Sequence, residues 1–281
     1  MVLEAGATEA VWAYPTMNAS AIARVVETAR AHPQCKVVGL VDSAAGLTLW
    51  QNVLSDRKTP NVLLRVDLDP GMGRTGIALD AGAIELALAV RQTGLFDGWH
   101  LYDGHIQNVD MEIRTQRFEQ VRQQLDTLFF EAARQHLSCD LIAGGSYSFP
   151  LWATRSDARV SPGSWMYSSS QHQVELHDLN WNVGAYVLST VLSERNGTVT
   201  LDAGSKAISP DQPMEKRFHG VERIVGMKEE HTIAIAPQLR PGDRVALVPR
   251  HACTTAYLYN KAMVLTVEGQ WEYRAQLGCE R

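Results

Sequence analysis

A histidine and a cysteine two residues apart are the clearest chemical signal in the sequence. His251 and Cys253 lie in the stretch 249–253 (PRHAC), which follows a Pro-Gly-Asp turn and an apolar run over 244–248. If the apolar run is a strand that continues through them, both side chains project to one face and can approach one ion. Neutral imidazole and thiolate are donors that suit zinc, whereas magnesium and calcium prefer oxygen. We therefore predict a divalent metal site at His251 and Cys253, with zinc preferred and manganese as the alternative. Two ligands are also compatible with a buried cysteine beside a structural histidine.

Other candidate residues follow predicted strands in the first part of the chain. Gly144, Gly145 and Ser146 offer backbone N–H groups and a hydroxyl, which together can form a phosphate cradle, or simply a turn. Arg74 can hold an anionic oxygen or pair with a surface acid. His105 can carry protons near neutral pH or serve as a hydrogen-bonded structural residue.

The elements that must position these residues alternate regularly. Predicted strands at 10–14, 36–41, 62–68, 98–102, 139–143 and 158–167 are separated by helical patterns at 18–31, 43–54, 81–92 and 110–136. Strands that alternate with helices pair in parallel, and six such units in roughly 170 residues favour a barrel over an open sheet. In a (β/α)₈ barrel the site is built from loops at the carboxyl ends of the strands, where Arg74, His105 and Gly144 would meet.

The rhythm changes after about residue 169. Short strand patterns at 198–201, 232–236, 244–248 and 263–267 are separated by glycine and proline turns, and a helical pattern at 183–192 precedes them. We therefore predict two domains, an α/β barrel over 1–169 and a mostly β domain over 170–281.

Composition excludes several classes of function. The 281 residues are 45% hydrophobic and carry a formal net charge of -5 without a basic block. These values predict a globular protein with a small-molecule partner, with no nucleic acid and no membrane partner. The four scattered cysteines fit a reducing cytoplasm.

Taken together, the motifs resemble those of the D-threonine aldolase and D-serine dehydratase family. Their order and spacing match over nearly the whole chain. The matching motifs are Gly71–Gly76 (GMGRTG), Tyr102–His105 (YDGH), Ala143–Ser146 (AGGS), Pro162–Gly163, Asp202–Lys206 (DAGSK), Glu229–His231 (EEH) and Pro249–Cys253. The resemblance implies a pyridoxal 5'-phosphate enzyme with an alanine-racemase-like TIM barrel followed by a β domain, and it implies a homodimer.

The resemblance also implies roles for individual residues. Gly144, Gly145 and Ser146 match the loop that binds the cofactor phosphate. Arg74 matches an arginine near the phenolic oxygen of the cofactor, while Tyr102 and His105 match residues around the ring and the substrate. His251 and Cys253 match metal ligands, and a His-x-Cys pair is typical of the dehydratases in this family, whereas the aldolases pair His with Asp.

One expected residue is absent from its place. The Schiff-base lysine of the family lies on the first barrel strand, whereas the first predicted strand here resembles the third. About six β/α units fit before the β domain, although a full barrel has eight. We therefore expect that the first two strands and the lysine are missing from this chain.

Three functions remain open on the sequence. The first is a pyridoxal-phosphate- and metal-dependent lyase for D-3-hydroxy amino acids, which would catalyse either elimination or retro-aldol cleavage. The second is a noncatalytic remnant that lacks the Schiff-base lysine and binds metal or phosphate. The third, a zinc hydrolase on a barrel, leaves the glycine loop and Arg74 unexplained.

Overall fold

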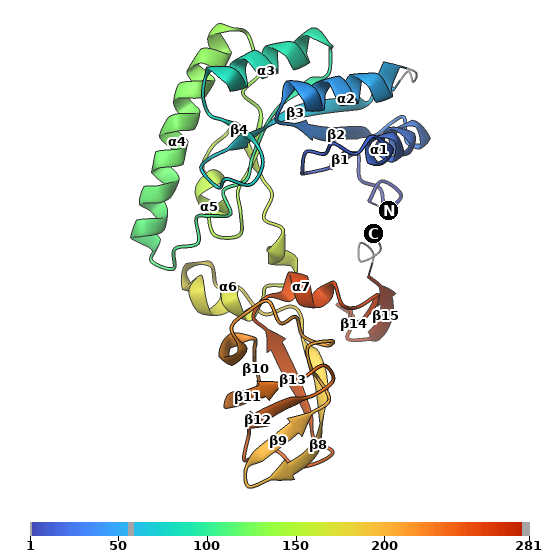
Figure 1. Cartoon of the computed structure of the whole chain (residues 1–281), viewed down its shortest axis with the longest axis vertical. Coiled ribbons are helices and arrows are strands. Elements are labelled where there is room, and N and C mark those ends of the chain that lie inside the picture. The colour runs from blue at the N-terminus through green and yellow to red at the C-terminus, as the bar shows by residue number, and fades with distance from the viewer. Residues whose placement is uncertain (1, 56–58, 277–281) are drawn as a thin grey trace. The chain divides into compact units, whose positions relative to one another are not determined.

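The computed structural model describes residues 2–55 and 59–276. The chain folds into two compact units, Met1–Pro162 and Gly163–Arg281, each with its own hydrophobic core (Figure 1). The change of unit therefore falls after Pro162, whereas the sequence pattern predicts it after residue 169.

Unit 1 is built on a parallel sheet, as the alternation of strands and helices predicts. The strand order is β1-β2-β3-β5-β6-β7, with the short β4 paired to β3, and every pairing is parallel. The strands are β1 (Glu9–Val11), β2 (Lys36–Val41), β3 (Val62–Asp69), β4 (Ile77–Ala78), β5 (Phe96–Leu101), β6 (Leu141–Ala143) and β7 (Ala158–Val160). The strand predicted over 158–167 stops at Val160, and a 3-10 turn at Ser164–Met166 occupies part of the remainder.

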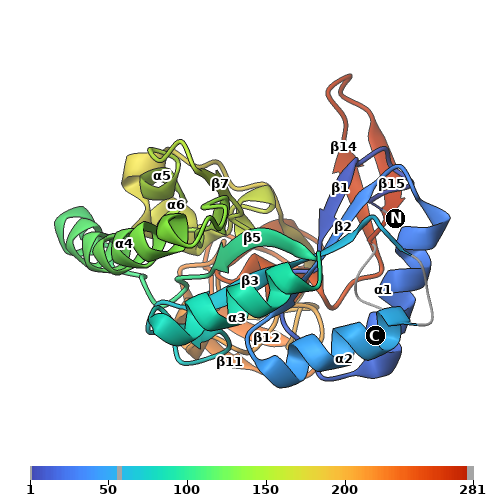
Figure 2. The same ribbon diagram turned by 90° about the horizontal axis from the view of Figure 1, so that it is seen from above.

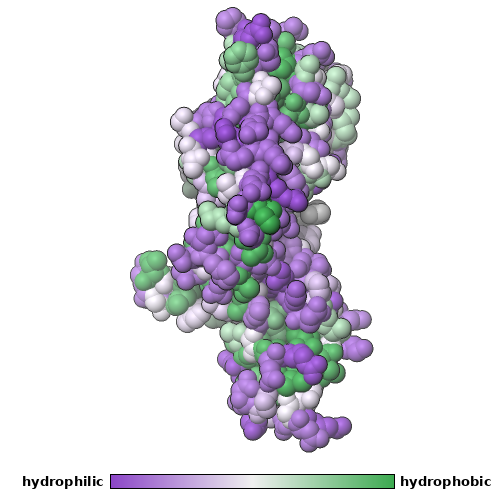
Figure 3. Space-filling model, turned by 90° about the vertical axis from the view of Figure 1, so that its left-hand side faces the viewer, coloured by the Kyte–Doolittle hydropathy of each residue, from purple (hydrophilic) through white to green (hydrophobic). Residues whose placement is uncertain are grey.

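Helices cover the outer face of this sheet. They are α1 (Ala19–Ala31), α2 (Ala44–Ser55), α3 (Ala81–Gln92), α4 (Met111–Arg134) and α5 (Phe149–Trp152), and α1 to α4 contact one another in chain order (Figure 2). Asn18, Asp80 and Asp110 cap three of them by accepting hydrogen bonds from first-turn N–H groups. The face that carries α4 is mostly hydrophilic (Figure 3). Among the described residues, no helix combines the length and apolar character that a membrane span requires.

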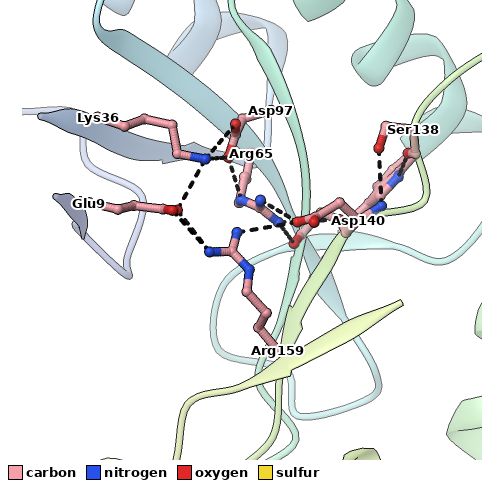
Figure 4. Close-up of polar contacts among 8 residues, drawn as sticks. Glu9, Lys36, Arg65, Asp97, Ser138, Asp140 and Arg159 are labelled. Carbon is pink, nitrogen blue, oxygen red and sulfur yellow. Dashed lines mark hydrogen bonds and ion pairs between the residues drawn. The ribbon is translucent and has the colours of Figure 1, made fainter. Parts of the chain in front are cut away.

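A closed ring of charges lies at the amino ends of the strands. Each member contacts two members of opposite sign, and the buried Arg65 is 1% exposed (Figure 4). Arg159 on β7 contacts Glu9 on β1 at 3.0 Å, so the ring joins the two edge strands of the sheet. The members of this ion ring, in contact order, are Glu9, Lys36, Asp97, Arg65, Asp140 and Arg159.

Unit 2 is a mostly β unit, as predicted. An antiparallel sheet has the order β10-β13-β8-β9-β12-β11, and β14 and β15 form a separate hairpin. The strands are β8 (Val187–Arg195), β9 (Thr198–Leu201), β10 (Phe218–His219), β11 (Arg223–Met227), β12 (Thr232–Ile235), β13 (Arg244–Pro249), β14 (Lys261–Leu265) and β15 (Trp271–Ala275). The helices α6 (Ser170–Glu175) and α7 (Ala252–Ala256) are short, with 3-10 turns at His177–Leu179 and Met214–Lys216.

The helix predicted over 183–192 is wrong, because this segment enters β8. Val187, Ser189 and Val191 are buried, whereas Leu188 and Leu192 are exposed. The burial alternates with a period of two, which is the period of a strand. Leucines on the outer side give both faces apolar residues, and this hides the alternation in the sequence.

Candidate functional site

A carboxylate at the end of β3 holds the glycine-rich loop that follows this strand. Asp69, the last residue of β3, accepts hydrogen bonds through Oδ1 from the backbone N–H groups of Gly71, Met72 and Gly73 at 3.0, 2.7 and 3.1 Å. Gly71, Gly73 and Gly76 have positive φ angles, which L side chains adopt at a cost. The conformation of Gly71–Gly76 is therefore set by its positive φ angles and by the half-buried acceptor Asp69, and Arg74 in this loop is exposed.

Arg74 and Tyr102 lie together in unit 1. The guanidinium carbon of Arg74 is 4.6 Å from the centroid of the Tyr102 ring. The ring lies so close to Gly104 that a Cβ there would be 2.5 Å from it, and a Cβ on Gly145 would be 3.5 Å from the other edge of the ring. Arg74, Tyr102 and Gly145 therefore form one group beside the carboxyl edge of the parallel sheet.

The backbone N–H groups of the Gly144-Gly145 loop are already engaged. Gly144 N donates to Leu101 O at 3.2 Å, and Gly145 N donates to Asp103 Oδ1 at 2.9 Å. The predicted phosphate cradle is thus not built from these two amides, because their donors point at protein acceptors. Ser146 is half-buried and contributes a hydroxyl to this loop.

Asp103 organises this loop, and the sequence reasoning gave it no role. The residue is fully buried and accepts hydrogen bonds from Gly145 N, from Ser148 Oγ at 2.6 Å and from Trp152 Nε1 at 2.8 Å. Three donors stabilise a carboxylate that burial alone would disfavour. An aspartate directly after a buried strand, ahead of a glycine, is the sequence signal that could have indicated this role.

His105 lies next to this group and borders a cavity. Its Nδ1 is buried and has no hydrogen-bond partner among the described residues. The cavity has a volume of about 380 Å³ and no acidic residue in its lining. Its lining residues are Pro70, His105, Ile113, Gln116, Arg117, Gln120, Val121 and Gln124.

His251 and Cys253 do approach each other in unit 2, but by a different route from the one predicted. Strand β13 ends at Pro249, so the two residues do not share a strand face. His251 is instead the N-cap residue of α7 and Cys253 lies in its first turn. This turn brings the two side chains close enough for each to shift the pKa of the other.

Two further side chains complete this cluster. Asp211 Oδ2 is 2.5 Å from His251 Nδ1 and accepts from Thr254 Oγ1 at 3.2 Å. Ser164 Oγ is 3.1 Å from Cys253 Sγ. The sequence reasoning missed Asp211 and Ser164, since each lies far along the chain from the His-x-Cys pair.

Each side chain of the pair shifts the pKa of the other. The hydrogen bond to Cys253, aided by the contact with Asp211, raises the pKa of His251 to about 9 against the opposing effect of burial. The same hydrogen bond from His251 lowers the pKa of the Cys253 thiol, although burial opposes it. A bound metal would therefore displace a proton from His251 and take a thiolate that is already favoured.

The donor set is suitable for a soft divalent metal but is not closed. Across residues 2–55 and 59–276, no group of three or more His, Cys, Asp or Glu side chains has the arrangement of a metal site. His251 and Cys253 supply one nitrogen and one sulfur, and the carboxylate of Asp211 orients the imidazole, as carboxylates do around many zinc sites. The residues therefore fit two ligands with an outer carboxylate.

Comparisons with solved structures identify the fold. D-threonine aldolase from Filomicrobium marinum superposes with a TM-score of 0.86 at 20% identity, covering 96% of this chain and 76% of the aldolase. D-threo-3-hydroxyaspartate dehydratase from Delftia sp. HT23 gives 0.81 at 19% identity, with 98% and 80% covered. An alanine racemase-like protein from Idiomarina loihiensis gives 0.78 at 14% identity, with 96% and 78% covered.

Sequence comparison adds a domain assignment. Residues 184–265 match the model of the putative serine dehydratase domain. No curated protein matches the chain significantly by sequence. The predicted resemblance and the predicted fold class are confirmed. The chain therefore has the fold that D-threonine aldolase, D-threo-3-hydroxyaspartate dehydratase and an alanine racemase-like protein share.

Proposed function

We propose that this chain is a pyridoxal-phosphate- and metal-dependent lyase that acts on D-3-hydroxy amino acids. The observation that carries the proposal is the grouping of Arg74, Tyr102 and Gly145 beside the carboxyl edge of the sheet, in a fold shared with an aldolase and a dehydratase. In parallel barrels of this type, the loops at that edge build the active site.

The residues of unit 1 have complementary tasks in this proposal. Tyr102 offers a flat face, and Arg74 offers a cation over that face to an anionic oxygen of the cofactor. The hydroxyl of Ser146 would donate a hydrogen bond to the phosphate of the bound cofactor. When bound, pyridoxal phosphate supplies an electron sink for the pair released when a bond at the substrate α-carbon breaks. His105 borders the cavity, and in this proposal its imidazole holds or transfers a substrate proton.

His251 and Cys253 are the proposed metal ligands. A bound zinc ion would supply a Lewis acid for the 3-hydroxyl of the substrate. Asp211 fixes the ring orientation of His251 through Nδ1, and Ser164 donates toward the sulfur or accepts from it. The spacing supports the assignment, because the solved forms of D-threo-3-hydroxyaspartate dehydratase include a His-to-Ala mutant and a metal-free Cys-to-Ala mutant two positions apart. A His-x-Cys pair favours elimination over retro-aldol cleavage.

Two measurements on the purified chain test this proposal. Titration with pyridoxal phosphate, followed by its absorbance, should show saturable binding that Arg74→Ala weakens. Incubation with D-serine, D-threonine and D-threo-3-hydroxyaspartate, with cofactor and zinc present, should release 2-oxo acid or aldehyde and glycine. An unchanged cofactor spectrum at millimolar concentrations would contradict the cofactor assignment, and binding without any product would contradict the lyase activity.

A second candidate is binding of the cofactor or metal without turnover. Lys36 and Lys58 are the lysines of unit 1. Lys36 lies at the amino end of β2 within the ion ring, and Lys58 lies outside the described residues. Saturable binding of pyridoxal phosphate that borohydride does not make permanent, together with no product, would favour this candidate.

A further inference from the structure

A buried carboxylate below the candidate cofactor group links its two loops. Asp67 on β3 is 4% exposed and lies opposite His100 on β5, the neighbouring parallel strand. Its Oδ1 is 2.7 Å from His100 Nδ1, and His100 is also 4% exposed. Its Oδ2 accepts a hydrogen bond from Thr75 Oγ1 at 3.1 Å. One side chain thus connects the loop that follows β3 with strand β5.

The two hydrogen-bond partners of Asp67 lie next to the candidate cofactor residues in the sequence. Thr75 is the residue after Arg74, and His100 is two residues before Tyr102. Arg74 lies over the ring of Tyr102 at 4.6 Å, and each of the two side chains belongs to a different loop. The distance between the two side chains is therefore set by their loops. Asp67 forms hydrogen bonds with Thr75 in the first loop and with His100 on the strand that leads to the second.

The other carboxylates near this loop do not make that link. Asp69 binds backbone N–H groups of residues 71–73 within its own loop, and Asp42, just after β2, accepts from Gly76 N at 3.2 Å. These two acceptors order the loop from β3 and β2. Asp67 alone of the three also bonds β5.

We propose that Asp67 is a positioning residue, which sets the separation of Arg74 and Tyr102 by holding Thr75 and His100 together. This inference rests on the proposed function for its consequence, which is cofactor affinity, but the link itself is independent of the cofactor. A buried charged acceptor is well suited to this task, because its hydrogen bonds are stronger and shorter than those of a neutral group.

The link can be tested without any cofactor by hydrogen exchange followed by mass spectrometry. Asp67→Asn should speed exchange of amides in residues 70–76, because Thr75 loses its charged acceptor. Thr75→Val removes only the hydroxyl and should act in the same direction with a smaller effect. Asp80→Asn, at the cap of α3, is the matched control and should leave residues 70–76 unchanged. Unchanged exchange of residues 70–76 in both Asp67→Asn and Thr75→Val would overturn the proposal.

The consequence for the cofactor can be tested by a double-mutant cycle on the dissociation constant of pyridoxal phosphate. Asp67→Asn should weaken binding roughly tenfold, the size expected for one lost hydrogen bond to a charged group. In an Arg74→Ala background the same change should cost less than about twofold, because the arginine that it positions is gone. A general loss of stability would lower affinity equally in both backgrounds, and equal losses would overturn the proposal.

The two experiments separate this inference from the proposed function. If the chain does not bind pyridoxal phosphate at all, the proposed function fails, and the exchange measurement still decides whether Asp67 orders residues 70–76. Should Asp67→Asn prove insoluble, Thr75→Val carries both measurements, since its hydroxyl is replaced by a methyl group of similar size.

Discussion

The two candidate sites differ in how their side chains are held. In unit 1 the loops are held by two buried carboxylates, Asp67 and Asp103. Each of them forms hydrogen bonds with groups from separate segments of the chain. In unit 2 the pair His251–Cys253 lies at the start of one short helix, and its outer carboxylate Asp211 is exposed. The first arrangement fixes geometry before any ligand arrives, whereas the second leaves coordination to be completed by the ligand.

The largest expected effect is on zinc affinity at the pair His251–Cys253. Cys253→Ala removes one of two proposed ligands, and we expect zinc affinity to fall by at least about 100-fold. Asp211→Asn keeps both ligands and should weaken zinc by about tenfold, since it only orients His251. Competition with a chromogenic chelator measures both, and Cys139→Ala, a cysteine of unit 1, serves as the control. Equal zinc affinity in Cys253→Ala and Cys139→Ala would contradict the assignment.

Loss of the buried carboxylate of Asp103 should lower the free energy of unfolding. Asp103→Ala leaves Gly145 N, Ser148 Oγ and Trp152 Nε1 without their acceptor, and we expect the free energy of unfolding to fall by about 3 kcal/mol or more. Asp80→Asn, at an exposed helix cap, should cost less than about 1 kcal/mol. Urea unfolding followed by circular dichroism compares the two, and similar losses would show that Asp103 does not stabilise the fold in this way.

A smaller change should disturb the Arg74–Tyr102 contact itself. Gly104→Ala places a methyl group where the Tyr102 ring lies, so the ring must shift. We expect about tenfold weaker pyridoxal phosphate binding and a destabilisation of about 1–3 kcal/mol. Gly163→Ala is the control, because its Cβ would meet nothing within 4 Å and its φ is −73°. Unaltered cofactor binding in Gly104→Ala would separate the ring position from the cofactor site.

The smallest expected effect is the contribution of the ion ring to the pH dependence of stability. Burial tends to raise the pKa of Glu9, but hydrogen bonds from Arg159 and Lys36 outweigh it and lower the pKa below the ordinary 4.5. For Asp140, burial is likewise outweighed by Arg65, and the pKa falls below 3.8. Depressed carboxyl pKa values stabilise the fold above those ordinary values, and this contribution is lost as the pH falls through the lower folded values.

Urea titrations at several pH values between 7 and 3 measure this effect. The free energy of unfolding should decline less steeply below pH 5 in Glu9→Gln than in the unmodified chain, because the variant has one linked proton fewer. Identical slopes would show that Glu9 has the same pKa folded and unfolded.

Local patterns predicted much of the fold. The strand Lys36–Val41 and the helix Ala81–Gln92 have the predicted bounds, because an apolar run and a capped helical period are local signals. The segment beginning at Val187 was assigned to the wrong element, since leucines on its exposed side hide the alternation. Arg74 and Tyr102 came together because two parallel strands end at one edge.

Contacts between distant segments could not be predicted in the same way. Asp211 meets His251 across 40 residues, and Arg159 meets Glu9 across 150. No periodicity relates such residues, because only the folded register brings them together. The engagement of Gly145 N by Asp103 is a further example, since a glycine pair looks the same whether its donors face a ligand or the protein.

The ion ring has a consequence for how this sequence can change over evolutionary time. Six members alternate in sign around a closed circuit, with three cations and three carboxylates. Reversing one charge sets it against two like neighbours, and neutralising one leaves two neighbours each short of a partner. Substitutions at Glu9, drawn from the first strand, should therefore covary with those at Arg159, drawn from the last, although no backbone hydrogen bond joins their strands.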